Sequence, residues 1–270
     1  MNKLDAMRYA GEVNLKAIQT GIAVAIPGVT LQFVDEAIER VILGEGCEAP
    51  FKGYHGFPNV ACLSPNDVLV HGIPNEYKLR ANDILTIDVG TKYQGYCVDA
   101  ARTIIVPQED SWHPLENEGR DASRVKLMVA ADAILGAQMG VVKAGATLMD
   151  IVDAATRTAD ELGVRVIHEY GGHQIGKVIH EELDGYDGTF IPNVLDPRKT
   201  GLSSQIQQRR LAGYHLKEGQ TICLEPVVTF GSGDIMIDED GWTVRTTDGA
   251  DAAHSERCLI VTKDGYELLS

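Results

Sequence analysis

The sequence has no excess of basic residues. Its 270 residues include 24 lysines and arginines against 39 aspartates and glutamates, a net charge of −15. A chain this acidic is repelled by nucleic acids and by anionic membranes, so neither is expected as a partner. No apolar run is long enough to span a bilayer. The N-terminal segment MNKLDAMRYAGEVNLK carries charges too early and too often for a signal peptide.

The sequence also lacks the cysteine pattern of a disulfide framework. Its five cysteines are odd in number, widely spaced and without a CxxC motif: Cys47, Cys62, Cys97, Cys223 and Cys258. This pattern favours free thiols in a reducing compartment, so we expect a cytoplasmic protein. With 44% hydrophobic residues, the chain can bury a substantial core.

What the sequence does contain is a helix–helix–strand order that occurs twice. Apolar residues at three- and four-residue steps predict a helix over 4–22, and Thr30 is a plausible N-cap for a second helix that stops at Gly44. A helix over 123–139 and another capped by Thr147 follow the first strand region. The segments GVTLQFVDEAI and GATLMDIVDAA align around the two threonines, although so short a match also arises by chance.

This order predicts an α+β fold in one domain over 1–270, with related halves spanning about 1–110 and 120–270. Residues 184–218 lack clear periodicity and contain glycine and proline, so we expect an excursion between strands there.

Two aspartates, Asp88 and Asp99, interrupt the apolar segment LTIDVGTKYQGYCVDAART over 85–103. A tight hairpin centred at Tyr93–Gln94 would place the two carboxylates directly opposite each other, with Cβ atoms about 5 Å apart. Because like charges so close repel strongly, we expect either a shared proton or a cation between them, and a divalent cation is the simpler answer. The alternative is that one aspartate lies on the surface of an edge strand.

Three further apolar segments supply candidate ligands. His173 and His180 lie in EYGGHQIGKVIHEEL, Glu225 in TICLEPVV, and Glu256 in AHSERCLIVT. Any one of these residues alone is more often structural than functional. Two aspartates, one histidine and two glutamates in apolar surroundings together form a carboxylate-rich set suited to two metal ions.

The sequence resembles the type I methionine aminopeptidases over nearly its whole length. The motifs that carry the resemblance are YHGFP (54–58), VHGIP (70–74), TIDVGTKYQGYCVDAART (86–103), GGHQIG (171–176), IHEEL (179–183), LEP (224–226), DGWTV (240–244) and HSERCLIVT (254–262). The resemblance implies the pita-bread fold of creatinase and the aminopeptidases, in which two pseudo-symmetric helix–helix–strand halves surround a central antiparallel sheet.

The resemblance also implies a role for each motif residue. The implied metal ligands are Asp88, Asp99, His173, Glu225 and Glu256, holding two divalent ions of cobalt, manganese, iron or zinc. The implied catalytic residues are His71 and His180, which contact substrate near the scissile amide, and Glu225, which relays a proton. The implied methionine pocket comprises Tyr54, Phe57, Cys62 and Trp242, with Phe51 and Ile179 at matching positions.

The implied function is removal of the N-terminal methionine from nascent polypeptides and peptides, with a small second residue preferred, by a monomeric enzyme. One alternative is a dinuclear peptidase of the Xaa-Pro type, although such enzymes usually carry an N-terminal domain for which the residues before the first helix leave no room. Another is a non-catalytic peptide-binding member, which would be expected to have lost ligands.

Several residues depart from the family pattern. Gln174 stands where glycine is usual, Leu183 where proline is usual, and Ile179 where a larger aromatic is common. The segment 184–218 is also longer than in compact members. These departures bear on substrate preference rather than on metal binding.

Spacing alone makes a prediction about three cysteines. Cys97, Cys223 and Cys258 each lie two residues from a candidate ligand, and a step of two along a strand returns to the same face, about 6.5–7 Å away. We therefore expect three buried thiols that are slow to alkylate. They are either small apolar fillers or a place where excess Zn²⁺ is captured.

Overall fold

The computed structural model describes residues 2–107, 122–186, 188 and 190–270. The elements of the first half are α1 (Lys3–Val24), α2 (Leu31–Gly44), the short 3₁₀ helix η1 (Tyr54–Gly56), β1 (Ala61–Pro65), β2 (Val68–Val70), β3 (Ile84–Tyr93) and β4 (Tyr96–Ile105). Those of the second half begin with α3 (Ala122–Gly140), α4 (Leu148–Leu162), β5 (Arg165–Val166), β6 (Gly171–Gln174), β7 (Ile191–Pro192), α5 (Gly201–Gly213) and β8 (Thr221–Leu224). The last strands are β9 (Val227–Thr229), β10 (Ile235–Ile237), β11 (Val244–Thr246), β12 (Ala252–His254), β13 (Arg257–Val261) and β14 (Tyr266–Leu268).

The four helices predicted from periodicity are present, and their caps follow from the sequence. Thr30 accepts a hydrogen bond from the backbone N–H of Phe33, and Thr147 forms a reciprocal capping box with Asp150. Gly163 ends α4 in the left-handed conformation, with φ of 66°. Among the described residues, no helix is both long and apolar enough to cross a bilayer.

The excursion over 184–218 contains a helix that periodicity did not predict. Helix α5 occupies Gly201–Gly213, and Leu211 is its buried residue, whereas Leu202 and Ile206 are exposed. A helix that buries so little of its surface has no apolar stripe for the sequence to reveal. The excursion therefore carries ordered structure of its own.

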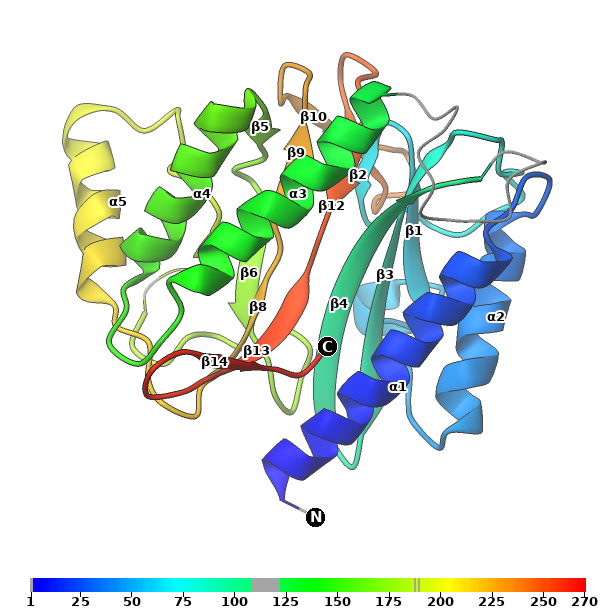
Figure 1. Ribbon diagram of the computed structural model, residues 1–270, viewed down its shortest axis with the longest axis horizontal. Coiled ribbons are helices and arrows are strands. Elements are labelled where there is room, and N and C mark those ends of the chain that lie inside the picture. The colour runs from blue at the N-terminus through cyan, green and yellow to red at the C-terminus, as the bar shows by residue number, and fades with distance from the viewer. Residues whose placement is uncertain (1, 108–121, 187, 189) are drawn as a thin grey trace.

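The strands of the described residues form four antiparallel groups, in the orders β1–β3–β4, β10–β11–β2, β12–β9–β5 and β14–β13–β8–β6–β7. In Figure 1, helices α1 and α2 lie on the right beside β3 and β4, α3 crosses in front of the strands of the second half, and α4 lies between α3 and α5. Helices and antiparallel strands of this kind form the expected α+β fold. The assignment of one domain with two related halves stays a prediction.

The β3–β4 hairpin differs from its predicted register. Gln94 and Gly95 form a two-residue loop with φ of 46° and 83°, so the strands pair as Tyr93↔Tyr96 and the register moves by two residues. The prediction of directly opposed aspartates was therefore wrong: Asp88 faces Ala101 and Asp99 faces Gly90. Because the shift is an even number, both carboxylates still lie on one face, as diagonal neighbours.

The two halves are joined by hydrogen bonds beside the candidate ligands. The backbone N–H of Glu256 donates to the carbonyl of Ala101 at 3.0 Å, and the N–H of Cys97 donates to the carbonyl of Gly176 at 2.7 Å. The Oγ of Thr103 donates to the carbonyl of His254 at 2.6 Å. Strand β4, which carries Asp99, is thus held against the candidate ligands of the second half.

Candidate active site

The five predicted metal ligands meet where the two halves join. Oxygen atoms of Asp88, Asp99 and Glu256 lie within 4.8 Å of one another. The Nε2 of His173 lies 3.9 Å from Glu225 Oε1 and 3.8 Å from Glu256 Oε1. The aspartates come from β3 and β4, His173 from β6, and the glutamates from residues next to β8 and β13. The structure therefore brings together side chains from five strand regions of the chain.

Two glycines allow this convergence because a side chain in their place would collide with the site. A Cβ on Gly172 would lie 2.1 Å from the carbonyl oxygen of Cys223, so only glycine lets β6 approach β8 beside His173. A Cβ on Gly90 would lie 2.7 Å from the ring of Phe51, which lines the same cavity as the carboxylates.

The carboxylates are buried without enough partners to satisfy them. Asp88, Asp99 and Glu256 are at most 9% exposed, and each has one side-chain oxygen without a hydrogen-bond partner among the described residues. Burial and the neighbouring carboxylates together raise the pKa of Asp88 and Glu256 well above the usual range of a carboxyl group. The pKa of Asp99 is also raised, and burial is the cause. In the absence of a cation, the cluster must therefore hold protons that a free carboxyl would lose.

His173 is oriented to present a lone pair to these carboxylates. Its Nδ1 lies 3.1 Å from the carbonyl of Gln174, an acceptor, so Nδ1 carries the proton and Nε2 does not. Burial lowers the pKa of His173 to about 3, so the ring is neutral. An unprotonated nitrogen facing carboxylate oxygens at 3.8 and 3.9 Å is repulsive unless a carboxyl proton or a cation lies between them. The donor set therefore fits a divalent metal ion.

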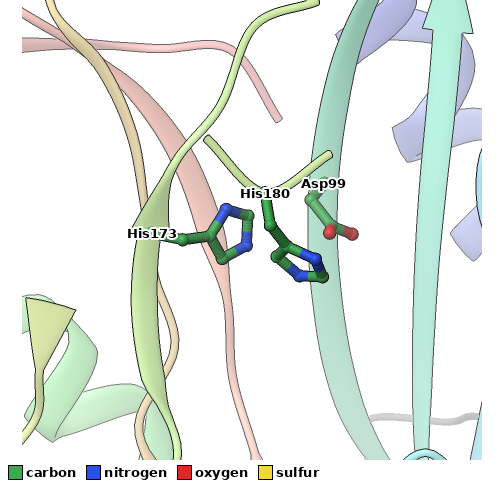
Figure 2. A group of neighbouring side chains, drawn as sticks. All are labelled: Asp99, His173 and His180. Carbon is green, nitrogen blue, oxygen red and sulfur yellow. The ribbon is translucent and has the colours of Figure 1, made fainter. Parts of the chain in front are cut away.

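His71 and His180 lie beside the candidate ligands, and among the described residues neither is oriented by a neighbouring backbone carbonyl in the way that His173 is. His71 follows β2 with φ of 58°, a left-handed conformation that strains a non-glycine residue, and its ring lies against Tyr170 with centroids 5.5 Å apart. Burial lowers the pKa of His71 to about 4. The Nδ1 of His180 lies 2.9 Å from the hydroxyl of Tyr54. In Figure 2, His180 lies between His173 and Asp99.

The predicted apolar residues line a cavity of about 120 Å³ above the ligands. Its walls include Phe51, Tyr54, Phe57, Cys62 and Trp242. The rings of Phe57 and Trp242 meet edge to face, with centroids 5.2 Å apart. Ile179 is buried in the same apolar cluster. A cavity this small is suited to one side chain rather than to a drug-sized ligand, which needs roughly 300–1,000 Å³.

The cysteine prediction is confirmed as far as burial goes. Cys97, Cys223 and Cys258 are at most 1% exposed, and Cys223 pairs directly with Cys258 across β8 and β13. The Sγ of Cys223 lies within 4.8 Å of ligand atoms of His173 and Glu256, so it shares their face. Burial raises the pKa of Cys97 to about 12, so this thiol stays protonated.

Sequence reasoning missed two buried residues that contact Glu225. The Nε2 of His254 lies 3.6 Å from Glu225 Oε2, and neither ring nitrogen of His254 has a hydrogen-bond partner among the described residues. The spacing argument used for Cys258 also places His254, two residues before Glu256, on the ligand face. Asn193 hydrogen-bonds the backbone of Glu225, and no local signal in the 184–218 segment indicates it.

Comparison with known proteins shows the family of the chain. Residues 5–263 match the model of metallopeptidase family M24. The chain is 31% identical over 268 residues to the methionine aminopeptidase of Mycoplasma capricolum, covering 99% of this chain and 95% of that protein. The crystal structure of the methionine aminopeptidase from Thermotoga maritima superposes with a TM-score of 0.84 at 30% identity, covering 99% and 96% of the two chains.

A more distant comparison shows that the fold is shared more widely. The prolidase of Pyrococcus furiosus superposes with a TM-score of 0.69 at 18% identity, and this chain covers 63% of it. That likeness shows the fold alone, whereas the likeness to the aminopeptidases extends to sequence over the full length. The chain therefore belongs to metallopeptidase family M24 and, within it, to the methionine aminopeptidases.

Proposed function

We propose that this protein removes the N-terminal methionine from polypeptides and peptides, preferring a small second residue, with two divalent ions bound by Asp88, Asp99, His173, Glu225 and Glu256. The observation that carries the proposal is the convergence of the buried carboxylates and the His173 lone pair beneath a small apolar cavity. When bound, divalent ions supply Lewis-acid polarisation of the scissile carbonyl and acidify a bound water.

The side chains that line the cavity account for binding of the substrate's N-terminal residue. The cavity wall of aromatic rings and Cys62 accepts the unbranched, polarisable methionine side chain. The substrate's free α-amine then lies above a cluster of carboxylates. An internal peptide bond has no amine to offer, so this arrangement favours cleavage after the first residue only.

Three side chains are placed to handle protons and charge. Glu225, with a half-buried carboxylate, is the candidate general base that moves a proton from water to the leaving amine. His180 is the candidate donor to the carbonyl oxygen as negative charge develops there. His71 is neutral near pH 7, because burial lowers its pKa, and it is the candidate partner of the scissile amide nitrogen.

The proposal also covers the cellular compartment, the oligomeric state and the natural substrates of the enzyme. We propose that it acts in the cytoplasm as a monomer on emerging N-termini. The net charge of −15 argues against a nucleic-acid partner.

A cleavage assay with defined peptides tests the function. Peptides beginning Met-Ala, Met-Leu and Xaa-Pro are incubated with protein that has been stripped of metal and reloaded with Co²⁺, Mn²⁺, Fe²⁺ or Zn²⁺. We expect release of methionine from the Met-Ala peptide, much less from Met-Leu, and none without metal. Cleavage of Xaa-Pro peptides alone would assign the protein to the Xaa-Pro type. Binding without cleavage of any peptide would favour a non-catalytic member.

A further inference from the structure

Asn193 is a buried polar residue outside the ligand set. It directly follows β7, whose pairing with β6 (Gly171↔Pro192 and Gly172↔Ile191) places the excursion beside the strand that carries His173. Its side chain is 1% exposed. A buried amide is costly unless its groups are hydrogen-bonded, so the partners of Asn193 indicate its role.

The Asn193 amide connects three segments that are far apart in the sequence. Its Nδ2 donates to the carbonyl of Glu225 at 3.1 Å and to the carbonyl of Tyr170 at 3.2 Å. Its Oδ1 accepts from Nε2 of Gln138, on α3, at 3.0 Å. These partners fix the orientation of the amide, because a flipped amide would set its oxygen against two carbonyl oxygens.

The backbone at Glu225 depends on this bond because it lies outside the strand ladder. Strand β8 ends at Leu224 and β9 begins at Val227, and the intervening Pro226 has no N–H group. Asn193 supplies a donor to the Glu225 carbonyl at this break. Its second bond holds Tyr170, whose ring contacts His71.

We propose that Asn193 is a positioning residue that fixes the main chain of Glu225, and thereby the direction of its carboxylate, for metal binding. The inference rests on the proposed function only in taking Glu225 as a metal ligand. Partners of metal ligands typically change metal affinity by about 10–100-fold when they are removed. Asn193 acts one step further out, through the backbone of the ligand.

The test compares Co²⁺ binding in Asn193→Ala and Asn193→Asp with binding in the matched control Asn59→Ala. Asn59 is also a buried asparagine, but its Nδ2 donates to Asp35, on α2, at 2.8 Å. Affinity is measured by equilibrium dialysis, and ligand geometry by the visible absorption of the Co²⁺ protein. Stability is measured by thermal unfolding of the metal-free proteins.

We expect Asn193→Ala to weaken Co²⁺ binding by about tenfold or more and to alter the absorption spectrum. Asn193→Asp should weaken it further, because a carboxylate not only lacks the donor, as alanine does, but also sets a negatively charged oxygen against the two carbonyl oxygens. Asn59→Ala should lower the unfolding temperature but keep the wild-type affinity and spectrum. Wild-type affinity in both Asn193 variants would overturn the proposal, as would an equal loss of affinity in Asn59→Ala.

A second variant covers the case in which the Asn193 variants do not fold. Gln138→Met removes the donor to Asn193 Oδ1, so the amide loses one of the three hydrogen bonds that hold it against the Glu225 carbonyl. We expect a smaller loss of Co²⁺ affinity, about threefold, and an unchanged affinity would contradict the proposal. Wild-type protein that binds Co²⁺ but does not cleave Met-Ala peptides would reject the proposed function and leave this inference standing.

Discussion

His173 and His180 show how two neighbouring histidines acquire different roles. Their ring centroids are 4.3 Å apart, yet His173 is buried with its Nδ1 beside the Gln174 carbonyl, whereas His180 is exposed with its Nδ1 beside the Tyr54 hydroxyl. The first environment fixes one lone pair toward the carboxylates. The second leaves a ring that is accessible to a peptide in the cavity.

Alanine substitutions should separate these roles. His180→Ala should lower turnover by about 10²–10⁴-fold with little change in metal content, because a group that assists the reaction is lost and no ligand is removed. His173→Ala should release metal. Peptide cleavage and metal analysis are carried out on both proteins. Normal metal binding by both variants would show that His173 is not a ligand.

The buried thiols allow a test of the site that needs no substrate. Cys97, Cys223 and Cys258 should react with iodoacetamide much more slowly than an exposed thiol, because access to these buried side chains requires local opening. For Cys97 and Cys223, burial also raises the pKa of the thiol and so lowers the fraction of reactive thiolate. Mass spectrometry of native and urea-unfolded protein gives the rates. Rapid native modification at these three positions would contradict the inward-facing strands.

Single residues were predictable from sequence where local spacing or a motif marks them. The five candidate ligands lie in motifs, and the period of two correctly placed the cysteines in the interior. Asn193 could not be found in this way. Its importance arises from contacts with Gln138, Tyr170 and Glu225, none of which lies near it in the sequence.

At the scale of elements, helix positions were more predictable than strand register. Threonine caps and apolar stripes locate α2 and α4 well. The hairpin register depends on whether Gln94 adopts a left-handed φ, which is uncommon for a residue other than glycine or asparagine. Helix α5 escaped prediction because it has almost no buried face.

The contact of β6 with β8 should be intolerant of any side chain at Gly172. Gly172→Ala places a Cβ 2.1 Å from the Cys223 carbonyl oxygen, and forcing the strands apart should cost about 3 kcal/mol of unfolding free energy. Gly136→Ala is the matched control, because its Cβ meets nothing within 4 Å on α3 and alanine favours a helix. Urea unfolding measures both. Equal stability of the two variants would show that the strands can separate freely.

For the whole molecule, the buried carboxylates make stability depend on pH and metal together. Because burial raises the folded-state pKa of Asp88, Asp99 and Glu256, their protonated forms stabilise the metal-free protein below the unfolded-state pKa near 4. That stabilisation is lost as the pH rises through the folded-state values, about 7 for Asp99. Metal binding requires the deprotonated carboxylates, so it should strengthen over the same range.

Thermal unfolding with and without metal should show that protons and metal stabilise the protein in opposite pH ranges. We expect a divalent ion to raise the unfolding temperature more at pH 8 than at pH 5.5, when each is compared with a chelator-treated sample. At a free metal concentration of 100 times Kd, the stabilisation is about 2.7 kcal/mol. A metal-induced shift of equal size at both pH values would contradict the buried carboxylate cluster as the binding site.

The two parts of the excursion over 184–218 differ in how tightly they pack against the rest of the protein, and this difference can be used in protein engineering. Residues 191–193 are tied to the site through β6 and Glu225, whereas α5 buries Leu211 and leaves Leu202 and Ile206 on the surface. Insertions are tolerated best where little backbone or apolar surface is buried. A reporter domain fused into α5 near Ser204 should therefore fold alongside an intact catalytic centre, whereas the same fusion at Asn193 should not. The chain thus offers an engineering site that is continuous with its active centre but separable from it.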